Sequence, residues 1–392
     1  MVKTGSLFTH LTCVECGREY PKAQANGVCT DETCRAILYA CYDFASSTLT
    51  REELKRRPPS LWRYREFLPV LDDENIVSLG EGFTPILPVL NLASHTAGKR
   101  VLIKDESGNP TGSFKARGLC LAVSKAKELG IRSFVIPTAG NAGGALSAYT
   151  ARAGLQAHVF MPKLTPQAFK AEAGLFGAEV TEVDGNISDC GKIANRLAAE
   201  NGWFDVSTLK EPYRLEGKKT MGYEIAEQLD WNVPDVILYP TGGGTGIIGI
   251  WKAFNELEQL GWIGSRRPRM VAVQSRNCDG ICTAFHQKEI RSTYKDEGFT
   301  VANGLRVPKP YADKVILQVL RESNGNSVSV GDADILVALR ELAASEGLLI
   351  APEGAALWHA YKELNRSGWI KDGETVLLLN TGSGYKYLDN IY

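Results

Sequence analysis

The chain has 392 residues, of which 44% are hydrophobic and 23% charged, and its formal net charge is -1. This composition is that of a globular protein long enough for two domains, and the balanced charge excludes a basic surface built for nucleic acid or an anionic membrane. No apolar run approaches the roughly 18 residues of a membrane span, and the N-terminus lacks the apolar region of a signal peptide. We therefore expect a cytoplasmic protein.

The N-terminal segment is rich in cysteine. Cys13 and Cys16 form one close pair, and Cys29 and Cys34 form a second. Two such pairs are typical of a zinc ribbon, in which thiolates complete a tetrahedral site, and a cytoplasmic location favours metal over disulfides. The pattern predicts a structural zinc held by Cys13, Cys16, Cys29 and Cys34. The alternatives are four reduced thiols in a ribbon without metal, and a site in which Cys41 is a ligand.

The rest of the chain alternates between strand and helix patterns. Residues 51–75 are charged and interrupted by prolines, which indicates a helical connector. Apolar runs predict strands at 132–137, 156–162, 179–185, 235–240, 270–275 and 374–380, and amphipathic patterns predict helices at 143–154, 167–177, 187–202 and 247–261. This alternation predicts an α/β protein with a mostly parallel sheet, whose ligands bind at the carboxyl ends of the strands.

Two stretches in the first half of the α/β region contain residues that could take part in catalysis or ligand binding. ESGNPTGSFKARG (106–118) places Lys115 behind a series of turn-forming residues. PTAGNAGG (137–144) follows a predicted strand and offers Thr138, Asn141 and backbone N–H groups. Taken alone, the first is compatible with a solvated lysine in a turn, and the second with a turn capped by asparagine.

YPTGGGTGIIG (239–249) joins a predicted strand to a predicted helix. Consecutive glycines let the backbone approach a ligand, and the helix N-terminus offers unpaired N–H groups, which together predict a phosphate site. The next strand ends in Gln274-Ser275, without a carboxylate for ribose hydroxyls, and no Gly-Lys-Ser/Thr follows. A cofactor with one phosphate therefore fits better than a dinucleotide or a nucleoside triphosphate.

The last predicted strand leads into LLLNTGSGYKY (377–387), in which Thr381 and Ser383 place hydroxyls in a glycine-rich turn. An amine, a phosphate site, an asparagine and a terminal hydroxyl together match pyridoxal phosphate. This cofactor needs an amine for its Schiff base, a phosphate anchor, and partners for its phenolic oxygen and its ring nitrogen.

The combination resembles the fold-type-II family of pyridoxal-phosphate-dependent enzymes, through NPTGSFKARG, TAGNAGG, TGGGTG and NTGSGYK. Within this family it is similar to the threonine synthases, through SLGEGFTPI (78–86), KDESGNPTGSFK (104–115), EPYRLEGKKTMGYEIAEQL (211–229) and APEGAALWHAY (351–361). The resemblance implies a tryptophan-synthase-β-like fold with two open twisted α/β domains, an N-terminal cysteine-rich ribbon and a homodimer. The implied domains are a ribbon at 1–50, a large cofactor-binding domain at 51–120 and 230–392, and a smaller domain at 121–229.

The resemblance also implies roles for individual residues. Lys115 forms an aldimine with the cofactor, Phe114 supports it, and Asn141 bonds the phenolic oxygen. Thr381 meets the pyridine nitrogen, with Ser383 as the alternative. The cofactor phosphate is held by Gly242, Gly243, Gly244, Thr245 and Gly246, and the substrate carboxylate by Thr138, Ala139, Gly140 and Ala142. Arg214 lies near the substrate phosphate.

The implied enzyme is a pyridoxal-phosphate-dependent lyase of the threonine synthase type, which converts O-phosphohomoserine and water to threonine and phosphate. Two departures keep other reactions open. Ala116 stands where threonine synthases usually carry aspartate, and the stretch from Thr208 to Glu211 lacks their usual Asn-Ser pair. The alternatives are a β-eliminating serine/threonine dehydratase or ammonia-lyase, and a β-replacement synthase for a phosphorylated or sulfonated amino acid. A ligand-sensing protein on a degraded scaffold is disfavoured because Lys115, the phosphate site and Thr381 are all retained.

Overall fold

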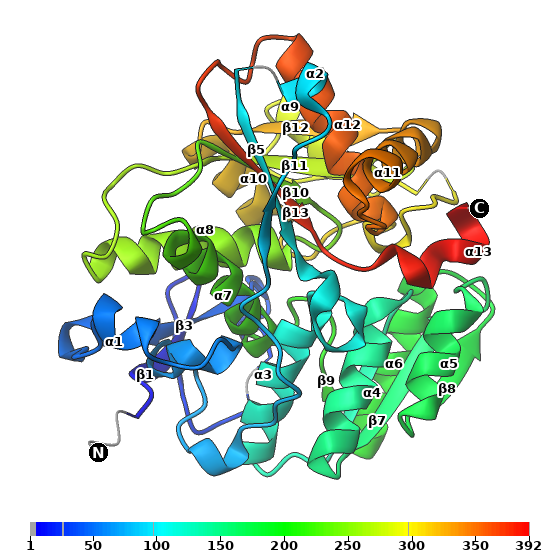
Figure 1. The fold of residues 1–392 in the computed structure, drawn as a ribbon. Helices are drawn as coiled ribbons and strands as arrows, with labels where there is room; N and C mark the ends of the chain where they lie inside the picture. Colours follow the sequence, from blue (N-terminus) through cyan, green and yellow to red (C-terminus); the bar gives the residue numbers. More distant parts are fainter. Residues whose placement is uncertain (1–4, 26, 97, 297, 392) are drawn as a thin grey trace. The chain divides into compact units, whose positions relative to one another are not determined.

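The computed structural model describes residues 5–25, 27–96, 98–296 and 298–391. The chain forms two compact units (Figure 1). Unit 1 comprises residues 1–83, 115–222 and 255–262, and unit 2 comprises residues 84–114, 223–254 and 263–392. Among the described residues, no helix is both long enough and apolar enough to span a bilayer.

Unit 1 begins with the cysteine-rich ribbon, a three-stranded antiparallel sheet. Its strands are β1 (Phe8–Cys13), β2 (Glu19–Pro21) and β3 (Leu38–Tyr42), in the order β2-β1-β3. The ribbon shares one hydrophobic core with the α/β part of unit 1, because Phe8, Leu11 and Tyr42 belong to the same buried cluster as Leu119 and Tyr213. The ribbon is therefore integrated into unit 1.

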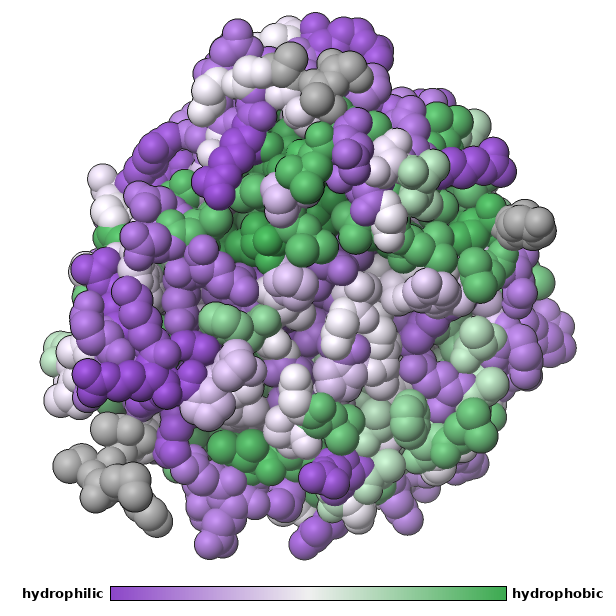
Figure 2. All heavy atoms as spheres, in the orientation of Figure 1, coloured by the Kyte–Doolittle hydropathy of each residue, from purple (hydrophilic) through white to green (hydrophobic). Residues whose placement is uncertain are grey.

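The connector after the ribbon contains less helix than its charge pattern predicts. Its one α-helix, α1 (Arg51–Lys55), begins at a capping box formed by Thr50 and Glu53. Pro58 and Pro59 lack the N–H donors that a longer helix needs, and short 3-10 turns follow at Leu61–Phe67 and Asp73–Asn75. Figure 2 shows the hydrophilic surface over α1, at the left of the view.

The α/β part of unit 1 is a parallel four-stranded sheet in the order β8-β7-β6-β9. Its strands are β6 (Ser133–Pro137), β7 (Gln156–Pro162), β8 (Glu179–Val183) and β9 (Phe204–Asp205). Its helices are α3 (Lys115–Glu128), α4 (Asn141–Ala153), α5 (Gln167–Leu175), α6 (Ile187–Asn201) and the first part of α7 (Tyr213–Gln228). Helix α4 starts two residues before the predicted 143 because Gly143 and Gly144 serve packing: a Cβ on Gly144 would overlap the Glu172 carboxylate of α5.

The ribbon is also tied to α7 by a buried polar network. The Tyr42 hydroxyl donates to Glu216 Oε2 at 2.7 Å, and Lys219 Nζ lies 3.9 Å from the centre of the Tyr42 ring. Lys219 Nζ in turn lies 2.6 Å from Glu216 Oε2 and 3.0 Å from Glu256 Oε2, and both partners of the first pair are fully buried. One ammonium group thus joins two carboxylates and one aromatic face in the interior of unit 1.

Unit 2 is built on a six-stranded sheet in the order β12-β11-β10-β13-β5-β4, which is parallel except for the edge strand β4. The strands are β4 (Ile86–Pro88), β5 (Arg100–Asp105), β10 (Val236–Pro240), β11 (Arg269–Ser275), β12 (Asn326–Val330) and β13 (Thr375–Asn380). The helices are α2 (Ala93–Thr96), α8 (Thr245–Gln259), α9 (Gly280–His286), α10 (Asp313–Glu322), α11 (Asp332–Glu346), α12 (Pro352–Arg366) and α13 (Leu388–Ile391), of which α8 ends in unit 1.

Three neighbouring strands of unit 2 position the predicted loops. Strands β10, β13 and β5 are consecutive and parallel, so their carboxyl ends lie at the same edge of the sheet (Figure 1). The glycine loop follows β10, the Thr381 turn follows β13, and the segment before Lys115 follows β5. This is the edge at which α/β sheets bind their ligands.

Candidate active site

The glycine loop forms a tight anion cradle between β10 and α8. A Cβ on Gly242 would overlap the carbonyl oxygen of Gly304, and Gly244 has a positive φ of 80° and packs against Ile316. Helix α8 begins at Thr245, so its first N–H groups have no partners within the helix and are available to a ligand. Only glycine fits at positions 242 and 244, and the loop therefore keeps its backbone close to whatever it binds.

The Thr381 turn lies directly against the segment before Lys115. The N–H of Phe114 donates to the carbonyl of Thr381 at 3.0 Å, and the N–H of Ser383 donates to the carbonyl of Gly112 at 2.9 Å. Thr381 is buried, whereas the Ser383 hydroxyl accepts the N–H of Tyr385 within its own turn. This engagement of Ser383 favours Thr381 as the hydroxyl available to a ring nitrogen.

Unit 2 also holds buried hydroxyl groups at this edge that lack protein partners. Thr111 Oγ1 and Ser113 Oγ form no hydrogen bond with any residue that the structure describes, and neither does the Tyr239 hydroxyl, which lies against Gly246. Burial raises the pKa of Tyr239 well above its usual value, with a smaller contribution from Glu106. Unsatisfied buried hydroxyls are rare in folded proteins, and here they fit a polar ligand such as a phosphorylated cofactor.

The predicted residues of unit 1 lie at the starts of helices and, for the Thr138 loop, at the carboxyl end of β6. Lys115 is the first residue of α3, and the Thr138 loop joins β6 to α4. The Thr138 hydroxyl accepts the N–H of Gly140 at 3.1 Å, and no side chain caps the first turn of α4, which starts at Asn141. The N-terminus of a helix is a place at which backbone N–H groups suit a carboxylate.

Arg214 is held at the start of α7 with much of its guanidinium unbonded. Its side chain is buried, with a relative exposure of 1%, and Nη1 donates to the carbonyl of Val206. Nε and Nη2 have no hydrogen-bond partner within the described part of the chain. Burial lowers the pKa of Arg214, and the charges of Glu211 and Asp205 oppose this change. A buried guanidinium with free N–H groups fits an anionic ligand.

The Glu211 carboxylate caps the start of α7. Its carboxylate accepts the N–H of Tyr213 at 2.7 Å and that of Arg214 at 3.1 Å. Burial raises the pKa of Glu211 to about 7, and the charge of Arg214 acts against this rise. Because helix N–H groups engage this carboxylate, it would oppose a nearby phosphate less than a free carboxylate would.

The site residues fall into two groups. Unit 1 contains Lys115, Thr138, Ala139, Gly140, Asn141, Ala142 and Arg214, and unit 2 contains Phe114, Gly242, Gly243, Gly244, Thr245, Gly246, Thr381 and Ser383. The structure brings the cradle, the Thr381 turn and Phe114 to one sheet edge within unit 2. One residue that sequence reasoning missed is Lys218, whose side chain is buried near Lys115. Its only sequence signal is its spacing of four residues from Arg214.

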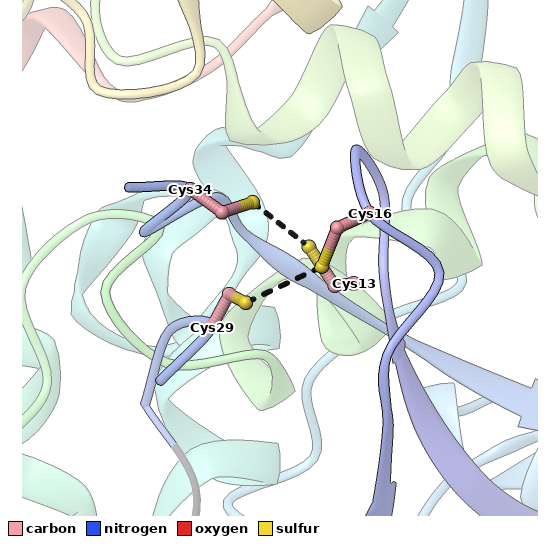
Figure 3. A group of neighbouring side chains, drawn as sticks. All are labelled: Cys13, Cys16, Cys29 and Cys34. Atoms are coloured by element: carbon pink, nitrogen blue, oxygen red, sulfur yellow. Dashed lines mark hydrogen bonds between the residues drawn. The ribbon is translucent and has the colours of Figure 1, made fainter. Parts of the chain in front are cut away.

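The four predicted zinc ligands converge within the ribbon. Their sulfur atoms all lie within 4.8 Å of one another and point toward a common centre (Figure 3). Cys13 and Cys34 have sulfur atoms 3.5 Å apart, and Cys16 and Cys29 have sulfur atoms 3.6 Å apart. Zinc–sulfur bonds of about 2.3 Å in a tetrahedron place sulfur atoms about 3.8 Å apart, so the group fits this metal. Cys41 lies outside the group.

The protonation of Cys29 also suits metal binding. Burial raises its pKa, but hydrogen bonds from the Tyr20 hydroxyl and the Asp31 backbone outweigh this effect and bring the pKa to about 7. The thiolate is the form that binds metal.

Comparison with known proteins identifies the class. The family described as pyridoxal-phosphate dependent enzyme matches residues 77–382. The chain belongs to this family and is an enzyme of fold type II, as its motifs predict.

Within the family, the chain is similar to threonine synthases. It is 36% identical over 374 residues to the threonine synthase of Methanosarcina acetivorans, covering 95% of this chain and 91% of the relative. It is 34% identical over 377 residues to that of Methanocaldococcus jannaschii, covering 95% and 92%. The solved diaminopropionate ammonia lyase of Escherichia coli shares the fold, with a TM-score of 0.68 and 19% identity over 83% of this chain and 95% of that one. The chain is thus a lyase-type enzyme that is similar to threonine synthases.

The cradle allows a direct test of its fit to the cofactor phosphate. A Cβ on Gly246 would overlap the Tyr239 hydroxyl and ring, so Gly246→Ala is expected to displace the start of α8 and weaken binding of pyridoxal phosphate at least about 100-fold. Absorbance titration of the apoprotein measures this affinity. Adding Tyr239→Leu is expected to restore part of it, and Gly264→Ala, where a Cβ meets open space, is the control. Unchanged affinity in Gly246→Ala would exclude a cradle role for this position.

Proposed function

We propose that the protein is a threonine synthase, which converts O-phosphohomoserine and water into threonine and phosphate with pyridoxal phosphate on Lys115. The observation that carries this proposal is similarity to threonine synthases over 95% of the chain. The buried, partly unbonded guanidinium of Arg214 supports it, because a phosphorylated substrate needs such a partner.

The cofactor residues are proposed as follows. The N–H groups of the cradle from Gly242 to Gly246 hold the cofactor phosphate, and Asn141 bonds the phenolic oxygen. Thr381, rather than Ser383, meets the ring nitrogen, and Phe114 packs beside Lys115. When bound, pyridoxal phosphate supplies an electron sink for the substrate carbanion. A hydroxyl cannot provide the negative charge that keeps a pyridine nitrogen protonated, and this moderates the sink in favour of elimination or replacement over transamination.

The substrate residues are proposed to bind the carboxylate and the phosphate of the substrate and to remove its Cα proton. The segment of Thr138, Ala139, Gly140 and Ala142 binds the substrate carboxylate through backbone N–H groups and the Thr138 hydroxyl. Arg214 binds the substrate phosphate and orients it as a leaving group. The amine of Lys115 takes the proton from the substrate Cα, since a desolvated amine is a competent base near neutral pH.

The remaining features complete the proposal. A structural zinc is bound by Cys13, Cys16, Cys29 and Cys34, supported by the convergence of their sulfur atoms. The enzyme is a cytoplasmic homodimer, and its domains divide at about residues 50, 120 and 230.

The reaction is tested by product analysis of the purified enzyme with pyridoxal phosphate. Release of phosphate from O-phosphohomoserine with formation of threonine is the expected result. Formation of an oxoacid from threonine or serine, without phosphate release, would instead identify a β-eliminating dehydratase, which Ala116 leaves open. Consumption of a phosphorylated or sulfonated amino acid only with an added nucleophile would identify a β-replacement synthase. Either result would overturn the proposal.

A further inference from the structure

One carboxylate in unit 2 joins the glycine cradle to the Thr381 turn. Glu353 lies in the first turn of α12 and is buried, with a relative exposure of 4%. Its Oε1 atom accepts the N–H of Gly304 at 2.6 Å and the hydroxyl of Tyr387 at 3.0 Å. The two donors come from different parts of the candidate site, since Gly304 packs against the cradle and Tyr387 ends the 3-10 turn that follows Ser383.

Gly304 is the contact between Glu353 and the cradle. Its carbonyl oxygen occupies the place of a side chain at residue 242, because a Cβ on Gly242 would lie 2.3 Å from it. A Cβ on Gly304 would itself lie 2.8 Å from Glu353 Oε1. Gly304 is thus held between the carboxylate on one side and the first glycine of the cradle on the other. A shift of Gly304 would therefore disturb the backbone of Gly242.

The segment around Gly304 depends on other elements for its position. It joins α9 to α10 (residues 287–312), and among its described residues the only helix or strand is the 3-10 turn Asn303–Leu305. Gly304 is exposed, so that packing alone does not fix it. Asp332, in the first turn of α11, accepts the N–H of Val301 at 3.0 Å. Asp332 is therefore a matched comparison: a carboxylate at a helix start that holds the same segment, three residues before Gly304.

The start of α12 is anchored to the turn that follows β13. The N–H of Ala351 donates to the carbonyl of Gly382 at 2.9 Å. A Cβ on Gly354 would lie 2.5 Å from the side-chain oxygen of Asn380, the last residue of β13. The residues on both sides of Glu353 are thus packed against the end of β13 and its turn. The position of the carboxylate is therefore fixed by the turn that carries the hydroxyl proposed for the ring nitrogen.

We propose that Glu353 is a positioning residue for the cofactor: by holding Gly304 against Gly242, it sets the spacing between the glycine cradle and the Thr381 turn. This rests on the proposed function, in which the cradle binds the cofactor phosphate and Thr381 meets the ring nitrogen. Pyridoxal phosphate is a rigid ring with a short phosphate arm, so both of its ends are bound well only when these two parts of unit 2 are correctly spaced.

Two variants separate the reach of the Glu353 side chain from its charge, which by itself would stabilise the start of α12. Glu353→Asp keeps the charge but is one methylene group shorter, which withdraws the carboxylate from Gly304. Because a hydrogen bond to a charged group is lost, this variant is expected to bind pyridoxal phosphate about tenfold more weakly and to shift the phosphorus NMR resonance of the bound cofactor. Glu353→Gln keeps an acceptor oxygen at the same reach, and we expect an affinity within about threefold of the unmodified protein and an unshifted resonance.

Absorbance titration of the apoprotein measures the affinity, and phosphorus NMR of the loaded protein reports the surroundings of the phosphate. Asp332→Ala is the matched control, expected to lower the thermal unfolding midpoint while the affinity and the resonance stay unchanged. Gly304→Ala, whose Cβ would press on the Glu353 carboxylate, is expected to reproduce the effect of Glu353→Asp and carries the test if that variant fails to fold.

The proposal is overturned if Glu353→Asp or Gly304→Ala folds and binds the cofactor with unchanged affinity and resonance. It is also overturned if Glu353→Gln loses as much affinity as Glu353→Asp, since the charge would then be the cause. An equal loss in Asp332→Ala would overturn it as well, because the segment as a whole, and not the Gly304 contact, would then control binding. A different result, no near-visible band in the unmodified protein mixed with pyridoxal phosphate, would refute the proposed function itself.

Discussion

Replacing Lys115 with alanine is expected to abolish the near-visible band of bound pyridoxal phosphate and to reduce turnover more than about a thousandfold. Lys115 is proposed both to bind the cofactor covalently and to take the substrate proton, and no neighbouring amine can fill both roles at its position. Lys218 is a nearby amine, but it lies within the helix α7 and packs against Gly118. Because it is not on a loop, it cannot move into the position of Lys115. Absorbance spectra and phosphate release measure the two effects.

A second lysine of the same helix provides the control. Lys127 lies near the end of α3, where its ammonium donates to the carbonyl of Glu74 at 2.8 Å. Lys127→Ala is expected to retain the band, its abolition by borohydride, and full turnover. A persistent borohydride-sensitive band in Lys115→Ala would show that another lysine carries the cofactor.

Replacing Cys29 with serine is expected to remove about one equivalent of zinc and to lower the thermal unfolding midpoint by about 10 °C or more. Structural zinc contributes about 10–16 kcal/mol of binding free energy in small metal domains. If only part of this free energy stabilises the folded state of unit 1, its loss is enough to produce such a shift in the unfolding midpoint. Cys29 is fully buried and belongs to the same core cluster as Leu119 of α3 and Tyr213 of α7. Metal analysis and thermal unfolding measure the two quantities.

Cys41→Ser is the matched control for the metal site. Cys41 lies on β3 of the same ribbon, but its sulfur is 3.3 Å from the Thr12 hydroxyl and lies outside the group of four. This variant is expected to keep both its zinc and its unfolding midpoint. Purified unmodified protein without zinc, and unable to take it up, would contradict the proposed metal site.

Much of the α/β framework is predictable because its buried strands are continuous apolar runs. The strand predicted at 156–162 is β7, with the same bounds, and the helix predicted at 187–202 is α6. Strand β12 was not predicted, since NSVSV contains two serines and has no continuous apolar run. The connector was predicted as helical from its charge, but local proline chemistry limits its α-helix to Arg51–Lys55.

The chemistry of the site was predictable only in part, for a different reason. The cradle and the terminal hydroxyls follow strands, and sequence alone locates such loops. The role of Glu211 could not be predicted from the sequence, because the sequence does not distinguish a carboxylate that caps a helix from one that faces a ligand. Lys218 was missed because a basic pair at a spacing of four residues usually marks a solvated helix face, and only tertiary structure shows that this pair is buried.

The network of Tyr42, Glu216 and Lys219 makes the ribbon hard to dispense with. In a shortened chain that starts at residue 51, Glu216 and Lys219 would lose the hydroxyl and the aromatic face that now cover them. Water would reach an ion pair that lies two residues from Arg214 and next to Lys218 along α7. An evolutionary lineage could therefore lose the ribbon only together with changes in α7, and the two segments are expected to vary in concert.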